Sequence, residues 1–454
     1  MARRPQLWLS FYGDDLTGST DALEQLSLAG VATRLFLDPP TREQLQAFPG
    51  LQACGVAGLT RSLRPPAMRR ELRAAFARLR LLGAAQVHYK ICSTGDSSPA
   101  TGNLGVVLDL AREMFPGAFV PLLVAAPSLG RYTVFGHHFA RYGIGSAGAI
   151  HRLDRHPAIS RHPVTPMREA DLRRHLARQT QRPIALFDIL SLSRPLPECR
   201  ADFQQTLAGR PEVILFDALS AEHLARIGGL LAAQSSAKPP LFSLGSSGIE
   251  AALCAHWQQT GRLPVARPAT RPRPPVSQIL IGSGSCSPVT SAQIAWALAN
   301  GFAEVALNAA ALAVPAAAAR EEARGIRRAA RFLQAGRDVL VHTTRQGAEP
   351  QVRRQLKQHT AAQLGSALGR VLRGALEVHP VPRLCLAGGD TASFAARALG
   401  ITALMFGAPL TPGAPLCRAT APASPADACD IVLKGGQVGA ENFFAIVKSG
   451  GPPL

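Results

Sequence analysis

Short runs of apolar residues alternate with amphipathic stretches along the first part of the chain. The amphipathic stretches predict helices, one at Ser19–Ala29 and another that continues through Glu113. The apolar runs predict strands at Leu7–Phe11, Gln86–Ile91, Pro121–Ala126, Ile184–Phe187, Val213–Phe216 and Leu241–Ser243. Because the runs end in Gly, Ser, Thr or Asp and helical stretches follow them, the order predicts an α/β fold with a doubly wound, mostly parallel sheet.

A proline-rich segment, Arg262–Val276, interrupts this alternation. Proline fixes φ and has no N–H donor, so we expect a stiff, extended connector there. Beyond it, strands are expected at Gln278–Ile281, Ala303–Ala306, Asp338–His342, Arg383–Ala387 and Ile431–Leu433, with helices at Val289–Ala299 and within Pro350–Glu377. The chain is therefore predicted to form two α/β domains, residues 1–265 and 276–454.

The composition of the 454 residues agrees with this fold class. Aromatic residues make up 6%, and Ala and Leu supply most of the apolar content, which favours helices packed on sheets over an all-β sandwich. The most apolar long stretch, Ala303–Ala319, carries Glu304, Asn308 and Pro315, so no membrane-spanning helix is expected. Eight scattered cysteines without a C-x-x-C pair predict reduced thiols in a cytoplasmic protein, not disulfides or a zinc site.

The net charge of +19 leaves three explanations open. Five of the 49 basic residues are Lys and the others are Arg, spread along the whole length. This spread fits a coding preference for Arg, a field that attracts small anions, or a nucleic-acid surface. Because there is no basic arm and no interleaving of aromatic residues, the coding preference is favoured, a field that attracts a small anionic ligand comes next, and no nucleic-acid partner is expected.

The loop Tyr12–Gly18 carries two adjacent carboxylates between a predicted strand and a predicted helix. Asp14 and Asp15 are suited to hold sugar hydroxyls or to act as a general base. The alternative is a helix-capping cluster, because Asp and Thr near a helix start satisfy free N–H groups. Both roles are compatible, since one carboxylate can cap while the other faces a substrate.

The loop Tyr89–Ser98 begins with Lys90 at a strand end and continues with hydroxyl-bearing residues, among them Ser93, and with Asp96. A cation beside hydroxyl groups suits an anionic, polyhydroxylated ligand, and a solvated turn is the alternative. Arg131, after the third strand, offers a guanidinium that can bind a carboxylate through two hydrogen bonds.

Three glycine-rich loops follow predicted strands in the second domain. Small residues let backbone N–H groups approach phosphates, and a helix N-terminus favours negative charge. Three such loops in one domain predict a nucleotide phosphate cradle, with ordinary tight turns as the alternative for each loop. The candidate nucleotide-binding residues are Ser283, Ser285, Gly388, Gly389, Asp390, Thr391, Lys434 and Gly435.

Other motifs do not indicate a site. Gly143–Gly148 matches G-x-G-x-x-G, but no apolar strand precedes it and no helical pattern follows, so a dinucleotide fold is not expected there. No G-K-[ST] sequence is present, which excludes a Walker loop. His137, His138, His151, His156 and His162 lack a metal-ligand spacing and are expected to be satisfied within the fold or exposed, so metal ligands stay unassigned.

The ordered set of these loops resembles the four-carbon acid sugar kinases. The resembling pieces are GDDLTGSTDAL (13–23), YKICST (89–94), LGR (129–131), RHPVTPMREADLRRHL (161–176), SLGSSGIEAAL (243–253), GSGSCSPVTSAQI (282–294), AGGDTAS (387–393) and LKGGQVGAENFF (433–444). The resemblance implies an ATP-dependent kinase that phosphorylates the terminal hydroxyl of a small sugar acid. It also implies that the first domain binds the acid, the second binds ATP, and the reaction takes place in the cleft between the domains.

By motif position, the resemblance assigns six residues to ATP and four to the substrate. The six are Ser283, Gly388, Gly389, Asp390, Thr391 and Gly435, and the four are Asp14, Asp15, Lys90 and Arg131. We expect Lys90 or Arg131 to pair with the carboxylate of the acid, and Asp15 or Asp14 to accept the proton of the attacking hydroxyl. The glycine-rich loops and Mg²⁺ are expected to neutralise the phosphate charge, with Lys434 as a further cation.

The substrate loop departs from the common family pattern K-x-D-S-T-x-R-G. Cys92 stands where that Asp is usual, and Gly95 and Asp96 stand where Leu and Arg are usual. In the second domain, Asp390 stands where Glu is usual. A lost carboxylate and a lost Arg should change which acid fits, and the variant loop resembles the subgroup of 3-oxo-isoapionate kinases, which act on a branched sugar acid.

Two other functions remain as alternatives. One is a non-kinase enzyme that acts on sugar acids with the same scaffold, and the other is a regulator that binds sugar acids or nucleic acid. No helix-turn-helix or RNA-binding motif is recognisable, which counts against the regulator. The sequence leaves open which acid and which hydroxyl react, what Cys92 and Asp96 change, and whether the protein is a homo-oligomer.

Overall fold

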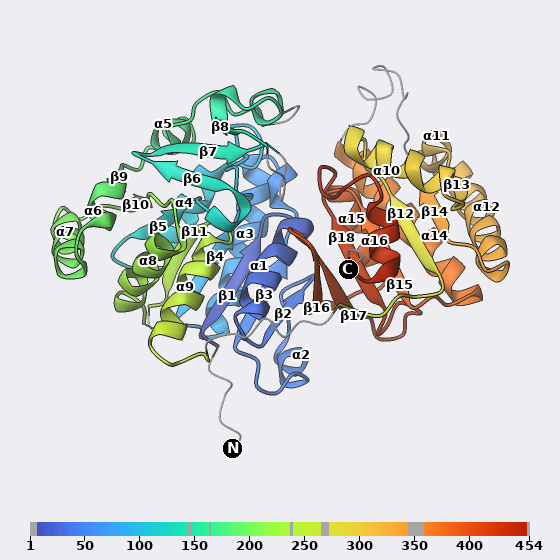
Figure 1. The fold of residues 1–454 in the computed structure, drawn as a ribbon, viewed down its shortest axis with the longest axis horizontal. Helices are drawn as coiled ribbons and strands as arrows, with labels where there is room; N and C mark the ends of the chain where they lie inside the picture. Colours follow the sequence, from blue (N-terminus) through green and yellow to red (C-terminus); the bar gives the residue numbers. More distant parts are fainter. Residues whose placement is uncertain are drawn as a thin grey trace. The chain divides into compact units, whose positions relative to one another are not determined.

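A computed structural model describes residues 7–142, 148–162, 165–236, 239–264, 272–343 and 358–451. The chain forms two compact units (Figure 1). The first comprises Met1–Asp14, Gln25–Arg34 and Asp38–Pro268, and the second comprises Asp15–Glu24, Leu35–Leu37 and Ala269–Leu454. Residues 265–271 of the predicted connector, residues 143–147 of the G-x-G-x-x-G match and residues 350–357 of the predicted helical region lie outside the described parts.

The first unit contains a sheet of seven parallel strands. Its order is β3-β1-β4-β11-β5-β10-β9, and each neighbouring pair is parallel. The strands are β1 (Leu9–Gly13), β3 (Ala53–Ala57), β4 (Gln86–Lys90), β5 (Val120–Leu123), β9 (Ile184–Phe187), β10 (Val213–Phe216) and β11 (Leu241–Gly245). The predicted α/β class and parallel sheet are confirmed, while β3 adds a strand that its short run of Ala, Cys, Gly and Val did not reveal.

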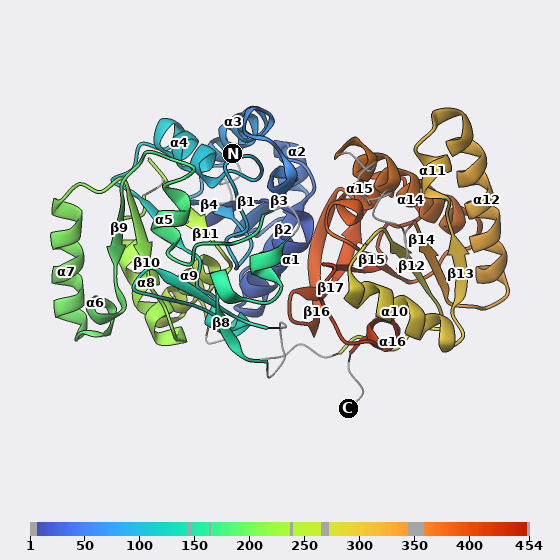
Figure 2. The ribbon, with the colours of Figure 1, turned by 90° about the horizontal axis from the view of Figure 1, so that it is seen from above.

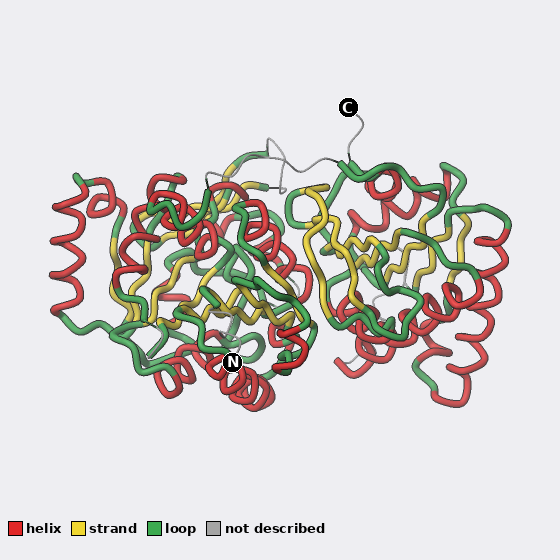
Figure 3. The backbone as a smooth tube through the Cα atoms, turned by 90° about the horizontal axis from the view of Figure 1, so that it is seen from below, coloured by secondary structure: helices red, strands yellow, loops and turns green. Residues whose placement is uncertain are grey.

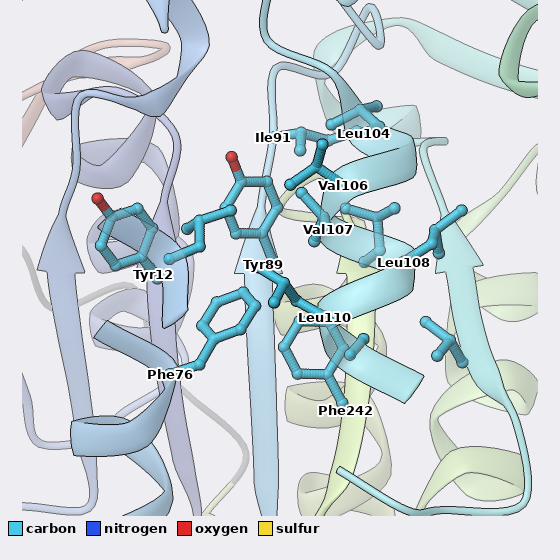
Figure 4. Packing of buried hydrophobic residues seen from close by; sticks show 14 of the residues in the cluster. Tyr12, Phe76, Tyr89, Ile91, Leu104, Val106, Val107, Leu108, Leu110 and Phe242 are labelled. Carbon is cyan, nitrogen blue, oxygen red and sulfur yellow. The ribbon is translucent and has the colours of Figure 1, made fainter. Parts of the chain in front are cut away.

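Helices cover both faces of this sheet (Figures 2 and 3). On one face, α3 (Pro65–Leu81) and α4 (Leu104–Met114) enclose a core in which the Phe76 ring lies 6.1 Å from that of Tyr89 and 5.1 Å from that of Phe242 (Figure 4). Neighbouring strand residues point to opposite faces. His88 therefore faces α9 (Gly248–Gln259), the helix that carries Glu250.

A separate antiparallel sheet of three strands follows β5. It contains β6 (Arg131–Val134), β7 (His137–Arg141) and β8 (Ile150–Arg152). Phe135 and Gly136 form the turn between β6 and β7 with φ of 50° and 81°, and Asp217 accepts hydrogen bonds from both N–H groups. The sequence pattern did not predict this sheet, because its strands are short and rich in His and Arg.

The second unit contains a sheet whose order is β13-β14-β12-β15-β18-β17-β16. The first five strands are parallel and the last two antiparallel, so the sheet is mostly parallel, as predicted. The strands are β12 (Ile279–Ser283), β13 (Ala303–Ala306), β14 (Val339–His342), β15 (Arg383–Ala387), β16 (Ala403–Thr411), β17 (Ala414–Thr420) and β18 (Asp430–Lys434). Part of β2 (Thr33–Phe36) pairs with β16 through Leu35 and Leu404.

Helices also cover both faces of the second sheet (Figure 3). On one face, α10 (Pro288–Ala299) and α16 (Phe443–Ser449) pack Ile294 and Phe443 against Ile281. On the other face lie α12 (Pro315–Gln334), α14 (Gln358–Val378) and α15 (Asp390–Ala398). The close approach of α14 requires Gly282, where an added Cβ would lie 2.6 Å from Leu372 Cδ1.

Helix α1 (Leu16–Leu28) begins earlier than expected. The interpretation of Tyr12–Gly18 as a loop is wrong, because β1 continues through Gly13 and only Asp14 and Asp15 precede the helix. Asp15 belongs to the second unit and Asp14 to the first, so the chain crosses between units at the two carboxylates.

The remaining helices are short or lie away from the strand ends that carry the candidate residues. They are α2 (Arg42–Gln46), α5 (Leu172–Leu176), α6 (Ile189–Ser193), α7 (Leu196–Ala208), α8 (Ala221–Ala233) and α11 (Ala309–Leu312). Within the described ranges, every helix is too short or too polar to cross a membrane.

Candidate active site

Four neighbouring strands of the first unit end at the same level. Gly13 pairs with Ala57 and Lys90, and Lys90 also pairs with Gly245. The pairing extends one residue further, since the Asp14 N–H donates to the Lys90 carbonyl at 2.9 Å. The loops that carry the predicted substrate residues therefore begin side by side, at the edge where open α/β sheets bind ligands.

Asp14 forms an ion pair with a residue that the sequence pattern did not single out. Nε and Nη2 of Arg61 lie 3.0 and 2.7 Å from Oδ2 and Oδ1 of Asp14. The Asp14 side chain is 3% exposed and the Arg61 side chain is 25% exposed. Arg61 lies in the 3₁₀ turn Thr60–Ser62 after β3, so recognising β3 would have drawn attention to it.

Asp15 has the capping role that was one of its two predicted roles. Its Oδ1 accepts the Gly18 N–H at 2.7 Å, and its Oδ2 accepts the Thr17 hydroxyl at 2.9 Å. Thr17 in turn borders a glycine-rich loop, because a Cβ added at Gly435 would lie 3.9 Å from Thr17 Oγ1. Asp15, Thr17 and Gly435 all belong to the second unit. The Asp15 carboxylate is therefore one hydrogen bond away from a side chain beside a predicted nucleotide loop.

The loop after β4 is cross-linked by its own side chains. Cys92 Sγ lies 3.0 Å from Thr94 Oγ1, and the Thr94 hydroxyl donates to Asp96 Oδ1 at 2.7 Å. Burial raises the pKa of the Cys92 thiol to about 11, which keeps the thiol neutral near pH 7. The Ser93 carbonyl lies 2.9 Å from His138 Nε2, which ties the loop to β7. Ser93 and Asp96 are thus held in one ordered loop.

Arg131 is a buried cation at the start of β6. It is 5% exposed, and burial lowers the pKa of its guanidinium. Its Nη1 lies 3.0–3.3 Å from the carbonyl oxygens of Leu129, Gly130 and Arg141. Within the described residues, its Nε has no hydrogen-bond partner and the guanidinium forms no ion pair with a carboxylate. Its predicted role in binding a substrate carboxylate stays a prediction, and the geometry leaves donors for it.

The three glycine-rich loops of the second unit lie next to one another. Ser283, Ala387 and Lys434, at the ends of β12, β15 and β18, pair in register. Beyond these ends, the Gly284 N–H donates to the Ala387 carbonyl and the Gly388 N–H to the Lys434 carbonyl, each at 3.0 Å. The structure thus brings together the residues that were predicted to form one phosphate cradle.

Glycine is required where the first two loops meet. A Cβ added at Gly284 or Gly388 would lie 2.6 or 2.5 Å from Thr391 Oγ1, and Gly388 has a φ of 133°. Gly389 differs, because a Cβ added there would have no heavy atom of the described residues within 4 Å. Gly389 directly precedes Asp390, the first residue of α15, so the described residues leave room beside the start of this helix. A helix N-terminus presents N–H groups and a positive dipole end to a phosphate.

The two predicted serines border the same loops. Ser283 is fully buried, and within the described chain its Oγ has no hydrogen-bond partner. The Ser285 Oγ accepts the Ser287 N–H at 3.2 Å and lies 3.0 Å from the position of a Cβ added at Gly436. Ser285 therefore lies at the contact between the first and third glycine-rich loops.

Lys434 is a fully buried ammonium group at the end of β18. Its Nζ donates to Thr290 Oγ1 at 2.9 Å and lies 5.7 Å from the centre of the Phe443 ring. Burial lowers the pKa of Lys434 to about 8. Among the residues that the structure describes, it forms no ion pair with a carboxylate. Because an uncompensated buried charge is costly, this group is suited to receive an anion.

Two of the histidines that the sequence grouped, His138 and His162, have side-chain hydrogen-bond partners within the fold. His138 lies 2.9 Å from Thr133 Oγ1 as well as from the Ser93 carbonyl. His162 Nδ1 accepts the Thr165 N–H at 3.0 Å. In the described part of the chain, no three His, Cys, Asp or Glu side chains gather in a way that could hold a metal ion.

Two family models match the chain, one over each half. A sugar-binding N-terminal domain matches residues 9–253, and a nucleotide-binding C-terminal domain matches residues 280–444. The first range contains the edge with Lys90 and Arg131, and the second contains the three glycine-rich loops.

Similar proteins are found among curated sequences and solved structures. The chain is 42% identical to the 3-oxo-isoapionate kinase of Paraburkholderia graminis over 98% of this chain and 94% of that protein. It is 30% identical to the 3-oxo-tetronate kinase of Pseudomonas savastanoi pv. phaseolicola over 96% of each. A crystal structure from Salmonella typhimurium LT2, described as a proposed tRNA synthase, has a TM-score of 0.74 and 26% identity over 96% of this chain and 98% of that one.

Proposed function

The chain belongs to the four-carbon acid sugar kinase family, and we propose that it transfers the terminal phosphate of ATP to the terminal hydroxyl of a small sugar acid. The observation that carries this function is a pair of buried cations, Arg131 and Lys434, one in each unit. Among the described residues neither forms an ion pair with a carboxylate, although the nearby charge of Asp96 partly offsets the lowering of the Arg131 pKa by burial. Because buried charges are stable only when compensated, each marks the place of an anion: the acid's carboxylate at Arg131 and a phosphate at Lys434.

The acid binds at the edge formed by β1, β4 and the start of β6. Nη1 of Arg131 already donates hydrogen bonds to three backbone carbonyls. The Nε–Nη2 side of its guanidinium is therefore the side that a carboxylate can approach with two parallel hydrogen bonds. Lys90 adds a second cation at this edge, and the carboxylate of Asp96 and the hydroxyl of Ser93 are suited to bind the hydroxyl groups of the acid.

We assign Asp15 as the proton acceptor. Asp14 is held in a two-point ion pair with the Arg61 guanidinium. Asp15 belongs to the second unit, and its Oδ2 accepts the hydroxyl of Thr17, which borders the glycine-rich loop at Gly435. In the reaction the acceptor oxygen forms a bond to the terminal phosphorus of ATP, the bond from that phosphorus to ADP breaks, and the hydroxyl proton moves to Asp15.

ATP binds at the glycine-rich loops of the second unit. The N-terminus of α15 behind Gly388 and Gly389, the loop that holds Ser283 and Ser285, and the Lys434 ammonium all favour phosphate. Asp390 and Thr391 lie in the first turn of α15, and Gly435 follows Lys434.

Mg²⁺ accompanies the nucleotide and supplies positive charge to the phosphates. This ion is usually bound by phosphate oxygens, waters and one or two carboxylates. A dedicated cluster of three protein ligands, which the described residues lack, is therefore not required. Asp390, the first residue of α15, follows the second glycine-rich loop directly and fits this limited role.

The substrate is a branched, oxidised sugar acid of the 3-oxo-isoapionate type. This finer assignment is supported by the relative of 42% identity that carries that name, against 30% for a 3-oxo-tetronate kinase. It is also supported by Cys92, a neutral side chain at a strand end that otherwise carries charge. A neutral thiol does not repel the carboxylate of the acid, and it does not need a hydroxyl group of the substrate as a hydrogen-bond partner. It is therefore suited to a substrate that is bulkier or carries fewer hydroxyl groups at this point.

The cytoplasm is the compartment that suits this activity. All eight cysteines are free thiols, which fits a reducing compartment, and ATP is the phosphate donor.

The test is an ADP-release assay with purified protein, ATP and Mg²⁺ against a panel of four- and five-carbon sugar acids, straight-chain, oxo and branched. We expect ADP release only when a suitable acid is present, with the highest kcat/KM for the branched 3-oxo acid. Conversion of an acid without consumption of ATP would instead establish a non-kinase enzyme. Tight, steeply salt-dependent binding of duplex DNA without turnover would establish the regulator.

A further inference from the structure

The third glycine-rich loop is held from behind by one buried side chain of α10. Gln293 is fully buried, and its Nε2 lies 3.0, 3.1 and 2.9 Å from the carbonyl oxygens of Val438, Gly439 and Ala440. Three carbonyls around one amide nitrogen also define the orientation of the Gln293 amide, because the opposite orientation would place an oxygen against all three.

A second side chain of α10 holds the start of the same loop. The Thr290 hydroxyl donates to the Gly436 carbonyl at 3.0 Å, and its oxygen accepts the Lys434 ammonium at 2.9 Å. Thr290 and Gln293 are three residues apart and therefore lie on the same side of the helix. Four of the loop's carbonyl groups are thus directed toward α10.

The geometry of the peptide bond then orients the N–H groups of the loop. In a trans peptide the C=O and the following N–H point in opposite directions. The N–H groups of Gln437, Gly439, Ala440 and Glu441 therefore point away from α10. Within the described chain none of these four N–H groups donates a hydrogen bond. Consecutive backbone N–H groups that point to one side form an anion-binding surface.

We propose that Thr290 and Gln293 are positioning residues that direct the backbone N–H groups of Gln437 and of residues 439–441 toward the phosphates of the bound nucleotide. This inference rests on the proposed ATP-dependent function and adds the donors of the third loop to the cradle. Neither side chain touches the nucleotide, and each acts through the loop that it holds.

The position of the loop supports this role. A Cβ added at Gly436 would lie 3.0 Å from Ser285 Oγ, so the start of the loop borders the first glycine-rich loop. Gly439 has a φ of 89°, and a Cβ added there would lie 2.3 Å from Phe443 Cδ2. The loop therefore has little freedom once Gln293 holds its carbonyls, and a rigid set of donors loses little entropy when it binds an anion.

The same chain offers a matched control for a purely structural role. Gln278 Nε2 also donates to two backbone carbonyls, those of Leu333 and Arg337, at 2.9 and 3.0 Å. Gln278 directly precedes β12, at the end of the strand opposite to Ser283. Loss of its amide removes contacts of the same kind without touching the glycine-rich loops.

The experiment compares Gln293→Met with Gln278→Met and wild type, by calorimetric titration with Mg²⁺ and ADP and by steady-state kinetics. For Gln293→Met we expect the Kd for ADP and the KM for ATP to rise about tenfold, with the KM for the acid unchanged. For Gln278→Met we expect a lower Tm and an unchanged Kd for ADP. Equal Kd values for ADP in wild type and Gln293→Met would overturn the inference and leave the proposed function intact. A wild-type protein that binds no ADP would overturn both.

A second pair of variants tests the inference if Gln293→Met does not fold. Thr290→Ser keeps the hydroxyl that holds Gly436 and Lys434, whereas Thr290→Val keeps the shape and removes the hydroxyl. We expect Thr290→Val to bind ADP about tenfold more weakly than Thr290→Ser, which should stay close to wild type. Equal ADP affinity in the two variants would overturn the inference.

Discussion

The carboxyl ends of the two sheets carry different groups. In the first unit, at the edge proposed to bind the acid, these groups are charged side chains, namely Asp14, Lys90, Asp96 and Arg131. In the second unit they belong mainly to the backbone around Gly284, Gly388 and Gly436, with Lys434 as the only buried lysine of the described part of that unit.

The difference fits the ligand that we propose for each edge. A sugar acid is small and is recognised by the arrangement of its hydroxyl and carboxylate groups, so side chains that differ in length and charge can select it. A phosphate chain offers the same oxygens in every nucleotide, and backbone N–H groups match them regardless of side chain. The first edge can therefore change specificity by single substitutions such as the one at Cys92, whereas the second depends on residues that shape its backbone, such as Gln293.

The largest effect is expected for Asp15→Asn, which should lower kcat without changing the affinity for the nucleotide. Asp15→Asn should lower kcat by about 10²–10⁴-fold, because the isosteric amide cannot accept the hydroxyl proton. Since the amide oxygen can still accept one capping hydrogen bond, the Kd for ADP should change little. Stopped assays of ADP release and calorimetry measure the two quantities. Near-normal turnover in this variant would remove Asp15 from its role as proton acceptor.

The second prediction concerns Arg131, at the edge of the first unit that is proposed to bind the acid. Arg131→Met should raise the KM for the acid by about 10–100-fold, the loss expected for hydrogen bonds to a charged group, and leave the KM for ATP unchanged. Steady-state kinetics with each substrate varied in turn measure both constants. Arg152→Met is the control: it removes a partly exposed ion pair between Arg152 of β8, in the same three-stranded sheet, and Asp154, and it should leave both constants as they are. An unchanged KM for the acid in Arg131→Met would place the carboxylate elsewhere, at Lys90.

The third prediction concerns Lys434, the buried cation at the end of β18. Its pKa of about 8 means that the ammonium charge is present below pH 8 and is lost as the pH rises through that value. The KM for ATP of the wild type should therefore rise above pH 8, whereas that of Lys434→Met should be about tenfold higher at pH 7 and show less of this rise. A pH profile of the KM for ATP measures both. Parallel profiles for the two proteins would exclude contact between Lys434 and the phosphates.

Although Lys434→Met should weaken ATP binding, it should make the ligand-free protein more stable. The pKa of Lys434 is lowered from 10.5 to about 8 in the folded protein, so the unfolded chain binds more protons between these values. Stability due to this group therefore rises with pH from about 8 to about 10.5, and the charged form is unfavourable below pH 8. Without ligand, Lys434→Met should have a higher Tm than wild type at pH 7, and this advantage should shrink at pH 10. A lower Tm at pH 7 would show that the hydrogen bond to Thr290 outweighs the burial of the charge.

The smallest effect is expected for Gly389→Ala, which should change the KM for ATP more clearly than the stability of the fold. Gly389→Ala adds a methyl group with no heavy atom of the described protein within 4 Å, so the Tm should change by only about 2 °C. The methyl group would enter the space in front of α15, and the KM for ATP should rise about threefold to tenfold. Gly117→Ala is the control, because its added methyl would also be nearly free of contacts, 3.9 Å from the Phe119 carbonyl, but lies in the first unit. Equal KM values for ATP in the two variants would show that no phosphate lies in front of Gly389.

Local patterns were sufficient for the parallel strands and for the loops that follow them. Apolar runs at 184–187, 213–216, 303–306 and 383–387 coincide with the strands β9, β10, β13 and β15. Asp14, Lys90 and the glycine-rich loops were found because they directly follow such runs. The three strands β6–β8 and the antiparallel strands β16 and β17 were not predicted, because short or two-faced antiparallel strands lack the apolar run on which the prediction depended.

The residues that hold the site from a distance could not be read from the sequence. Arg61 reaches Asp14 across 47 positions, and Gln293 reaches the loop at Val438–Ala440 across 145 to 147 positions. Arg61 follows a strand that the pattern did not reveal, and Gln293 belongs to the segment GSGSCSPVTSAQI, but neither position along the chain indicates which atoms the side chain holds. Their partners become visible only when the strands that carry them are placed side by side.

The amino-acid sequence by itself determined the α/β class, the order along the chain of the loops that follow the parallel strands, and the family of the protein. These properties depend on local hydrophobic periodicity and on short motifs. Only the tertiary structure decided that Asp14 is paired with Arg61 and that Arg131 and Lys434 are buried without an ion pair to a carboxylate. It also decided that side chains of α10 hold the carbonyl groups of the third loop, so that the free N–H groups of this loop point away from the helix. The physical reason is that charge compensation and hydrogen-bond direction depend on which atoms meet in space, and sheet pairing joins segments that lie far apart along the chain.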